Sequence, residues 1–406
     1  MTTISRLLVL LWLALASTFV FADDAVQRGR YLAAAGDCAA CHTARNGQPF
    51  AGGRVIPTPF GAIPAPNLTP DRETGLGAWS ADDFYRAMHS GKSHDGTSLY
   101  PAFPFTSYTK VTRADTDAIF AYLKTLPAIK RANTGNTLGW PYSMRSLMGA
   151  WRTMYFEEGE FQPDPAKSPA WNRGAYLVQG IGHCNECHAR RNSFGAMVDD
   201  PFLAGGIVPV QNWYAPDLSM GAGGGLAGWT EADVAALLKT GRSRKGTAFG
   251  PMAEVVMRST QHLSDSDLAA MATYLKSLPP RDPPRLRESA ADARELASRG
   301  RKVYTDQCAT CHADDGRGKG DAYPPLDGNG SVTDPTGINA IRIVLSGGFA
   351  PATASNPRPY SMPPFSQKLS DDDAAAVVTY IRQAWSNKAP SVSPNDIRAY
   401  RSVPGG

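Results

Sequence analysis

Six cysteines and the three histidines that follow them are the residues of this sequence best suited to chemistry. The pattern C-x-x-C-H occurs three times, as CAACH, CNECH and CATCH, and it uses every cysteine in the chain. The residues are Cys38, Cys41 and His42, then Cys184, Cys187 and His188, and finally Cys308, Cys311 and His312. Each motif therefore offers two thiols, three positions apart, with an imidazole directly after the second.

Several kinds of site use closely spaced cysteines. A structural zinc site brings four ligands together, and three residues this close in sequence do not give tidy tetrahedral geometry. A redox dithiol does not require the histidine and would lie near a βαβ pattern. Disulfides give no reason for a histidine after every second cysteine.

Covalent haem attachment explains every position of the motif. The two thiols add to the two vinyl groups of one porphyrin, and the histidine ligates the iron from the proximal side. The sequence therefore predicts three c-type haems, attached at the six cysteines. Their proximal ligands would be His42, His188 and His312.

A low-spin haem iron also needs a sixth ligand opposite the histidine, and methionine at that position raises the reduction potential. We expect this ligand in the loop before the last helix of each haem unit. In the third unit Met362 lies in YSMPPFS, where prolines stiffen the loop. In the second unit Met252 lies in FGPMAEVV, with Met257 as the alternative.

The first unit departs from this pattern. Aligning LYPAFPF with AFGPMAE places Phe103 at the position of Met252, and phenylalanine cannot ligate iron. Candidates nearby are Met88, His89 and His94, with Met144 further along the chain. The sequence leaves two alternatives open: a neighbouring side chain ligates the iron, or the iron keeps an open position for water or a small molecule.

The proximal histidines need their second ring nitrogen held in place. Pro66, Pro216 and Pro325 recur downstream of the three motifs. We expect a carbonyl oxygen from each proline segment to accept the Nδ1 proton of the histidine.

The motifs belong to a threefold imperfect repeat, in which an opening helix precedes each motif and a closing helix ends each unit. The opening helices carry a glycine, at Gly29, Gly174 and Gly300. The closing helices begin at an N-capping hydroxyl residue followed by Asp, at Thr112, Ser264 and Ser370. Each closing helix carries a tyrosine in the same register, at Tyr122, Tyr274 and Tyr380. We expect each glycine to let the closing helix cross it closely.

These elements predict an all-α protein of three tandem haem domains with long ordered loops, in agreement with its 39 glycines and 32 prolines. The predicted domains span 23–130, 169–283 and 284–390, with a linker at 131–168 and a tail at 391–406. In the linker, apolar residues at helical spacing predict an amphipathic helix: Met144, Leu147, Met148, Trp151, Met154 and Tyr155. We expect this helix to pack across the first two domains, with docking to a partner or a membrane as the alternative.

The N-terminus predicts export. Residues 1–22 have a positive start at Arg6, an apolar core, and small residues before a cleavage point after Ala22, which is typical of a secretory signal peptide. An uncleaved anchor is the alternative. The formal net charge of +4 is small and the basic residues are scattered, so no nucleic-acid partner is expected.

Beyond the haem motifs, four segments occur in a characteristic order: APNLTPD, LYPAFPFTSYTKVT, GPMAEVV and YSMPPF. With them, nearly the whole mature chain resembles the three-haem cytochrome c subunits of membrane-associated periplasmic dehydrogenases. These subunits serve alcohol, gluconate, sorbitol or fructose dehydrogenases, and similar ones serve molybdenum hydroxylases that act on aldehydes or N-heterocycles. The resemblance implies three tandem cytochrome c-like domains. It also implies that the family's usual methionine is replaced here by Phe103, which affects the first iron's ligand and not the haem's attachment.

The resemblance further implies a catalytic partner subunit that carries flavin, a quinone cofactor or molybdenum. Electrons would pass through the haems to ubiquinone or to a terminal oxidase or cytochrome. Peripheral association with the periplasmic face of the inner membrane would follow.

The sequence itself contains no nucleotide-binding glycine pattern, no catalytic triad and no specially placed carboxylate pair, so we expect the chemistry to reside in another chain. Two other functions compete with this one: a periplasmic multihaem electron shuttle, and a haem enzyme or sensor that uses an open iron in the first unit.

Overall fold

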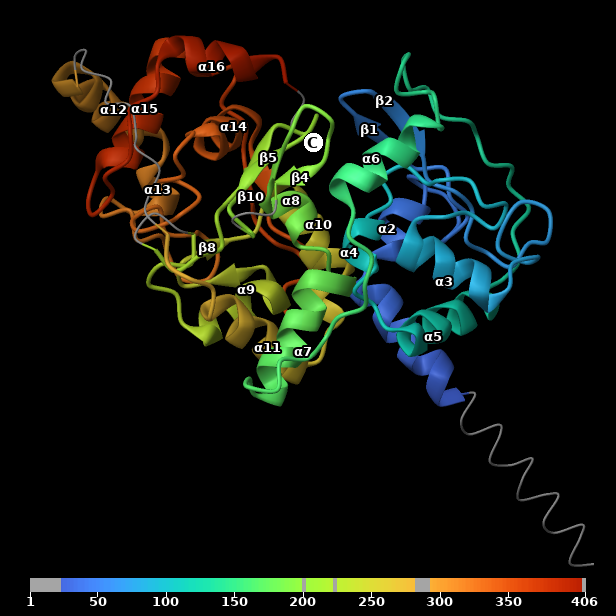
Figure 1. Ribbon diagram of the computed structural model, residues 1–406. Helices are drawn as coiled ribbons and strands as arrows, with labels where there is room; N and C mark the ends of the chain where they lie inside the picture. Colours follow the sequence, from blue (N-terminus) through green and yellow to red (C-terminus); the bar gives the residue numbers. More distant parts are fainter. Residues whose placement is uncertain (1–22, 199–201, 222–224, 282–292, 404–406) are drawn as a thin grey trace, which may run out of the picture. The chain divides into compact units, whose positions relative to one another are not determined.

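The computed structural model describes residues 23–198, 202–221, 225–281 and 293–403 (Figure 1). The predicted signal peptide, residues 1–22, lies outside the described residues. The chain divides into two compact units. Unit 1 comprises the residues up to Gln162 together with Gly180–His183, and unit 2 comprises Pro163–Gln179 and the residues from Cys184 onward. The first C-x-x-C-H motif lies in unit 1 and the other two lie in unit 2, so the division into three domains stays a prediction.

Helices dominate the chain, which confirms the predicted helical class. In unit 1 the helices are residues 23–35, α2 (Cys38–His42), α3 (Ala81–Ser90), α4 (Phe105–Tyr108), α5 (Arg113–Lys124) and α6 (Leu147–Tyr155). Next along the chain come α7 (Pro169–Tyr176), which belongs to unit 2, and a π-helical turn, η1 (Leu177–Ile181). The remaining helices of unit 2 are α8 (Asn185–His188), α9 (Glu231–Thr240), α10 (Gly250–Arg258), the 3-10 turn η2 (Thr260–His262), α11 (Asp265–Lys276), α12 (Ala293–Gln307), α13 (Ala309–His312), α14 (Ile338–Ser346), α15 (Asp371–Gln383) and α16 (Pro394–Arg401).

Short strands, which the sequence did not predict, accompany the helices. Within the described residues they form five two-stranded antiparallel ladders. The pairs are β1 (Val55–Thr58) with β2 (Gly61–Pro64), β3 (Arg190–Arg191) with β4 (Met197–Val198), β5 (Gly206–Val208) with β6 (Trp213–Ala215), β7 (Arg242–Ser243) with β8 (Gly246–Thr247), and β9 (Gly348–Phe349) with β10 (Ser361–Met362). They stiffen the segments between helices and leave the helical class unchanged.

The three predicted crossings of opening and closing helices are present. A Cβ atom added to Gly29 would lie 1.8 Å from the carbonyl oxygen of Ala118, one added to Gly174 would lie 1.9 Å from that of Ala270, and one added to Gly300 would lie 2.1 Å from that of Ala376. The same added atoms would lie within 2.9 Å of the Cβ of Tyr122, Tyr274 and Tyr380. Because any side chain would strike the backbone of the closing helix, these positions require glycine. Figure 1 shows two of the pairs side by side, α7 with α11 and α12 with α15.

An arginine precedes each of these glycines, and its role was missed in the sequence. The ion pairs are Arg28 with Asp115 (2.5 Å), Arg173 with Asp267 (2.7 Å) and Arg299 with Asp373 (2.8 Å). Each aspartate is the third residue of its closing helix, and its backbone N–H donates to the N-capping hydroxyl. The arginine therefore ties the opening helix to the capped end of the closing helix. The recurring Arg-Gly dipeptide was the signal that could have revealed this pairing.

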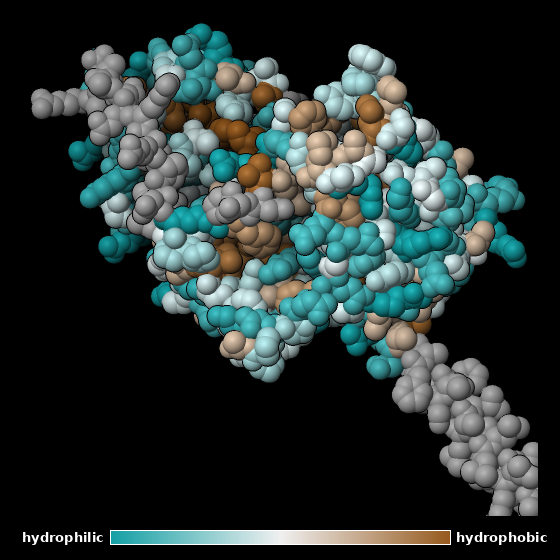
Figure 2. All heavy atoms as spheres, in the orientation of Figure 1, coloured by the Kyte–Doolittle hydropathy of each residue, from teal (hydrophilic) through white to brown (hydrophobic). Residues whose placement is uncertain are grey.

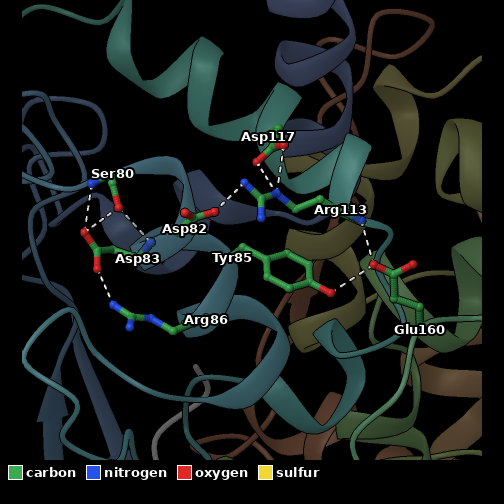
Figure 3. A network of polar contacts seen from close by, with 8 residues as sticks. All are labelled: Ser80, Asp82, Asp83, Tyr85, Arg86, Arg113, Asp117 and Glu160. Carbon is green, nitrogen blue, oxygen red and sulfur yellow. Dashed lines mark hydrogen bonds and ion pairs between the residues drawn. The ribbon is translucent and has the colours of Figure 1, made fainter.

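In unit 1 a polar network joins α3, α5 and the segment that ends at Gln162 (Figure 3). The Arg113 guanidinium contacts Asp82 of α3 at 2.7 Å and Asp117 of α5 at 2.8 Å. The Glu160 carboxylate accepts hydrogen bonds from the Tyr85 hydroxyl (3.0 Å) and the Arg113 backbone N–H (2.8 Å). Burial, together with this carboxylate, raises the pKa of Tyr85 to about 12. The network fixes the orientation of α3, which carries two of the candidate iron ligands.

The predicted amphipathic helix is present as α6, although it begins at Leu147 and so excludes Met144. Met148 and Trp151 are buried, and the Trp151 ring meets Phe105 edge-on at 6.2 Å. Leu147 and Met154 are exposed. The helix thus packs on unit 1 through one face, while its packing across two domains stays a prediction. Among the residues that the structure describes, no helix has both the length and the apolar character to cross a membrane.

The second and third motif regions pack together within unit 2. Asn339 of α14 exchanges two hydrogen bonds with the backbone of Tyr214 in β6, at 3.0 and 2.8 Å. The guanidinium of Arg342, also in α14, lies 4.4 Å from the ring centre of Trp213. The predicted tail forms α16, whose Ile397 is fully buried. These contacts explain why the two regions form one compact unit.

Candidate haem-binding sites

Each C-x-x-C-H motif folds as a single short helix. α2 contains the whole first motif, whereas α8 and α13 begin one residue after the first cysteine of their motifs. In the second and third motifs the histidine N–H donates to the carbonyl of that first cysteine, at 3.0 Å in both. Residues four positions apart on a helix share one face, so the first thiol and the imidazole lie on the same side.

All three histidines hold the same hydrogen bond. The Nδ1 atom of His42 lies 2.8 Å from the carbonyl oxygen of Pro66, and that of His188 lies 2.8 Å from Pro216. His312 makes the equivalent bond at 3.0 Å, but to Pro324 and not to the predicted Pro325. Because a carbonyl can only accept, Nδ1 must carry the proton in each ring. The Nε2 atom is left with its lone pair, which is the form of histidine that binds a metal.

The protonation of the rings agrees with this role. Burial lowers the pKa of His42, His188 and His312 below the usual 6.5, and the hydrogen bond to the proline carbonyl opposes this effect only in part. The rings are therefore neutral at pH 7, with one nitrogen available to iron.

The thiols do not resemble those of a redox site. Burial raises the pKa of Cys38 and Cys184 to about 12 and that of Cys308 to about 11. Catalytic and redox cysteines have depressed pKa values, because the thiolate is the nucleophile. None of the six cysteines forms a disulfide. Within the described residues, no three His, Cys, Asp or Glu side chains come together in a way that could hold a metal ion.

Met362 and the third motif border the same buried cluster. Met362 and Cys308 both pack against a core formed by α12, α14 and α15, in which Tyr304 and Ile341 are each 1% exposed. Met362 lies in β10 opposite Gly348 of β9. The residue before that glycine, Gly347, has a positive φ of 70°, and a Cβ there would lie 2.4 Å from the Met362 carbonyl oxygen. The strand pair therefore holds the backbone of the predicted ligand in place.

Met252 lies in the first turn of α10, although its sequence context predicts a loop. Gly250 begins this helix with a positive φ of 54°, and the Trp213 ring covers it at 2.9 Å from an added Cβ. Pro251 follows at a position that suits a helix start. Met252 is half-buried, as is Met257 near the other end of the helix. Helix packing, and not loop stiffness, orients the predicted ligand.

Comparison with known proteins decides the family. The model of the family described as cytochrome c matches residues 26–127 and 297–385. The cytochrome c subunit of alcohol dehydrogenase (quinone) from Gluconobacter oxydans is 40% identical over 401 residues, which cover 94% of this chain and 83% of that protein. This chain belongs to the family of dehydrogenase cytochrome c subunits. The resemblance expected from the sequence is confirmed.

Other relatives are named as subunits of different dehydrogenases. The gluconate 2-dehydrogenase cytochrome c subunit of Pantoea cypripedii is 39% identical over 400 residues, covering 93% of this chain and 90% of that protein. A nicotinate dehydrogenase subunit of Pseudomonas putida is 41% identical over 372 residues, covering 90% of this chain but 31% of that protein. Cytochromes of type c hold haem covalently. The thiols and neutral imidazoles of the three motifs fit that group.

In the first haem unit of this cytochrome, the structure assigns other contacts to the candidate iron ligands. His89 makes two polar contacts, from Nδ1 to the Thr109 carbonyl at 3.0 Å and from Nε2 to Glu158 at 3.5 Å. His94 is exposed and stacks on Trp79, with ring centres 5.1 Å apart. Met88 is a core residue of α3, only 4% exposed, and Met144 is 45% exposed ahead of α6.

His183, next to the second motif, was not singled out in the sequence. It belongs to unit 1, where its Nε2 lies 3.3 Å from the carbonyl oxygen of Gly36, and its ring meets Tyr108 edge-on at 5.5 Å. The Tyr108 hydroxyl donates to the same carbonyl at 3.1 Å. The backbone of His183 has a positive φ of 39°, which is unusual for a residue other than glycine. No sequence pattern marks this position, because the contact depends on residues far apart in the chain.

Proposed function

We propose that this cytochrome carries three covalent haems c and transfers electrons from a dehydrogenase catalytic subunit to the respiratory chain. One observation carries the proposal: three motif helices each present two thiols and a neutral histidine whose Nδ1 is bound to a proline carbonyl. A site repeated with the same donor set and the same supporting bond fits three equivalent groups of one kind.

The chain's own residues would attach and orient each haem. The paired cysteines would form the thioether links, and Nε2 of His42, His188 and His312 would bind iron. Met252 and Met362 would supply a thioether sulfur as a second protein ligand, which favours a higher reduction potential. When bound, a haem c accepts and releases one electron at a time. The proline carbonyls hold each imidazole in one orientation and raise its strength as a ligand.

The relatives are named as subunits of different dehydrogenases. The sequence of this chain therefore does not specify which dehydrogenase donates the electrons. The named relatives belong to alcohol, gluconate and nicotinate dehydrogenases. We therefore assign the donor as a separate catalytic subunit with flavin, quinone cofactor or molybdenum, which oxidises an alcohol, a sugar acid, an aldehyde or an N-heterocycle. The acceptor would be ubiquinone or a terminal oxidase or cytochrome.

Exposed apolar side chains supply surfaces on which such partners could dock. Phe349 and Tyr360, 75% and 66% exposed, lie on β9 and next to β10, the strand of Met362. Figure 2 shows hydrophobic residues, in brown, reaching the surface of unit 2 over β5, where Ile207 is 48% exposed. In unit 1, Leu147 and Met154 of α6 form a second exposed apolar face. Aromatic residues and methionine are enriched in protein interfaces, and electron-transfer encounters use small patches.

We place the mature protein in the periplasm, on the face of the inner membrane. The signal peptide expected at residues 1–22 supports export. Peripheral attachment through the catalytic partner or the apolar face of α6 would keep the haems next to a quinone acceptor.

Extraction from native membranes in mild detergent, followed by purification through this chain, tests the proposal. Mass spectrometry should find a catalytic subunit in equal amount, and the mass of the mature chain should include three haems. Dehydrogenase activity with an artificial acceptor should survive deletion of this chain, while activity with a quinone should be lost.

A purified protein with three haems and no partner, whose deletion leaves every membrane dehydrogenase active, would identify a periplasmic electron shuttle instead. Fewer than three haems, with unmodified cysteine in any of the three motif peptides, would contradict the haem assignment itself.

A further inference from the structure

We infer that the iron of the first haem has no protein side chain opposite His42, and that this position binds a small neutral molecule such as carbon monoxide or nitric oxide. The inference rests on the proposed haem attachment at Cys38 and Cys41. It would give this chain a ligand-binding function in addition to electron transfer.

The first step compares Met88 with its counterparts in the repeat. The helices α3, α9 and α14 each end at a glycine with positive φ, at Gly91, Gly241 and Gly347. Three positions before these glycines stand Met88, Leu238 and Val344, which are 4%, 7% and 6% exposed. Leucine and valine cannot ligate iron, and their units have other methionines in the expected place. Met88 therefore occupies an ordinary core position of the repeat.

The second step concerns the histidines. Both ring nitrogens of His89 are engaged, by the Thr109 carbonyl and by Glu158, and its ring stacks on Tyr85 with centres 4.9 Å apart. Iron ligation through Nε2 would break the contact with Glu158, and the stacking on Tyr85 fixes the plane of the ring. The stacking places His89 next to Tyr85, whose hydroxyl donates to Glu160 (Figure 3).

His94 corresponds to Arg244, since both follow the helix-ending glycine by three positions. The side chain of Arg244 is 67% exposed and turns back to Asp233 near the start of α9. His94 is likewise exposed, in a turn closed by the bridge between Lys92 and Ser98. This position in the repeat faces solvent and the preceding helix.

The third step concerns Phe103, which stands where the repeat expects methionine. Its ring lies 5.3 Å from that of Tyr108, and the Tyr108 hydroxyl donates to the carbonyl of Gly36, two residues before Cys38. Phe103 is therefore connected to the first motif by two successive contacts. A phenyl ring offers neither a lone pair nor a charge, so an uncharged molecule that binds ferrous iron directly suits this position.

Carbon monoxide titration of the complete, haem-loaded protein tests the inference. The dithionite-reduced protein should bind one carbon monoxide per chain, seen as a shift of the haem Soret band, while the other haems stay unchanged. Met362→Ala should raise the stoichiometry to two, which shows that the assay detects an opened iron.

Two substitutions of Phe103 form the matched pair. Phe103→Met should abolish binding to the first haem, increase the methionine–iron absorption of the oxidised spectrum and raise the potential of one haem. Phe103→Leu should retain carbon monoxide binding, since leucine also lacks a ligand atom.

Wild-type protein with full haem content and no carbon monoxide binding would overturn the inference, because a protein side chain must then hold the position. Loss of a methionine–iron band in Met88→Leu, Met144→Leu or Met148→Leu would identify that side chain. A Cys38 peptide without haem would contradict the haem assignment and the inference together, whereas missing haem at another motif would contradict the proposed function alone.

Discussion

The helix crossing at Gly29 gives a sharp test of the fold. In the structure, a Cβ atom at this position would lie 1.8 Å from the Ala118 carbonyl oxygen and 2.9 Å from the Cβ of Tyr122. Ordinary contact begins near 3.4 Å. Gly29→Ala would therefore force the first helix and α5 apart by roughly 1.5 Å, because the contact is with backbone that cannot rotate away.

The expected cost is about 1–3 kcal/mol, typical of overpacking a close-packed core. Alanine's higher helix propensity offsets less than about 1 kcal/mol of this cost. For a unit of this size, the melting temperature should decrease by about 2–12 °C. Gly149 in α6 is the matched control, since it is exposed and nothing lies within 4 Å of its added Cβ. Gly149→Ala should stabilise unit 1 by about 0.5–1 kcal/mol.

Thermal unfolding of the haem-loaded protein, followed by circular dichroism, measures both variants. Hydrogen exchange should show faster exchange in residues 23–35 and α5 of Gly29→Ala, which places the effect at the crossing. If Gly29→Ala is as stable as the wild type, or gains stability as Gly149→Ala does, the helices do not approach as closely as described and the argument fails.

Two further predictions concern buried carboxylates. Asp115→Asn should lower the free energy of unfolding in urea by about 1.5–3 kcal/mol, because the Asp115 side chain is 2% exposed and accepts a charged hydrogen bond. Asp117 is 41% exposed, so the control Asp117→Asn should lower it by less than about 1 kcal/mol. Hydrogen bonds from Arg244 and Thr230 lower the pKa of Asp233 from 3.8 to about 2, so its contribution is present above pH 3.8 and is lost as the pH falls toward 2. The free energy of unfolding should therefore fall by about 1–2 kcal/mol less in Asp233→Asn than in the wild type as the pH decreases from 3.8 toward 2. An equal decrease in both proteins would contradict the pairing of Asp233 with Arg244.

The motifs and the repeat were accessible from the sequence because they depend on local chemistry. Two thiols and an imidazole at fixed spacing define one attachment site without reference to the rest of the chain. The crossings at Gly29, Gly174 and Gly300 were also predictable, since only glycine permits such an approach and the partner tyrosines recur in register. The hydrogen bonds from Nδ1 of His42 and His188 to the carbonyls of Pro66 and Pro216 were also predictable, because these prolines recur downstream of the motifs.

Only the tertiary structure decided features that depend on residues distant in sequence. It replaced Pro325 by Pro324 as the partner of His312, placed Met252 on a helix, and joined the second and third motif regions through Asn339 and Tyr214. It also showed what occupies the nitrogens of His89. A side chain's availability to iron depends on which competing partners packing brings within hydrogen-bond distance, and sequence spacing carries no information about those partners.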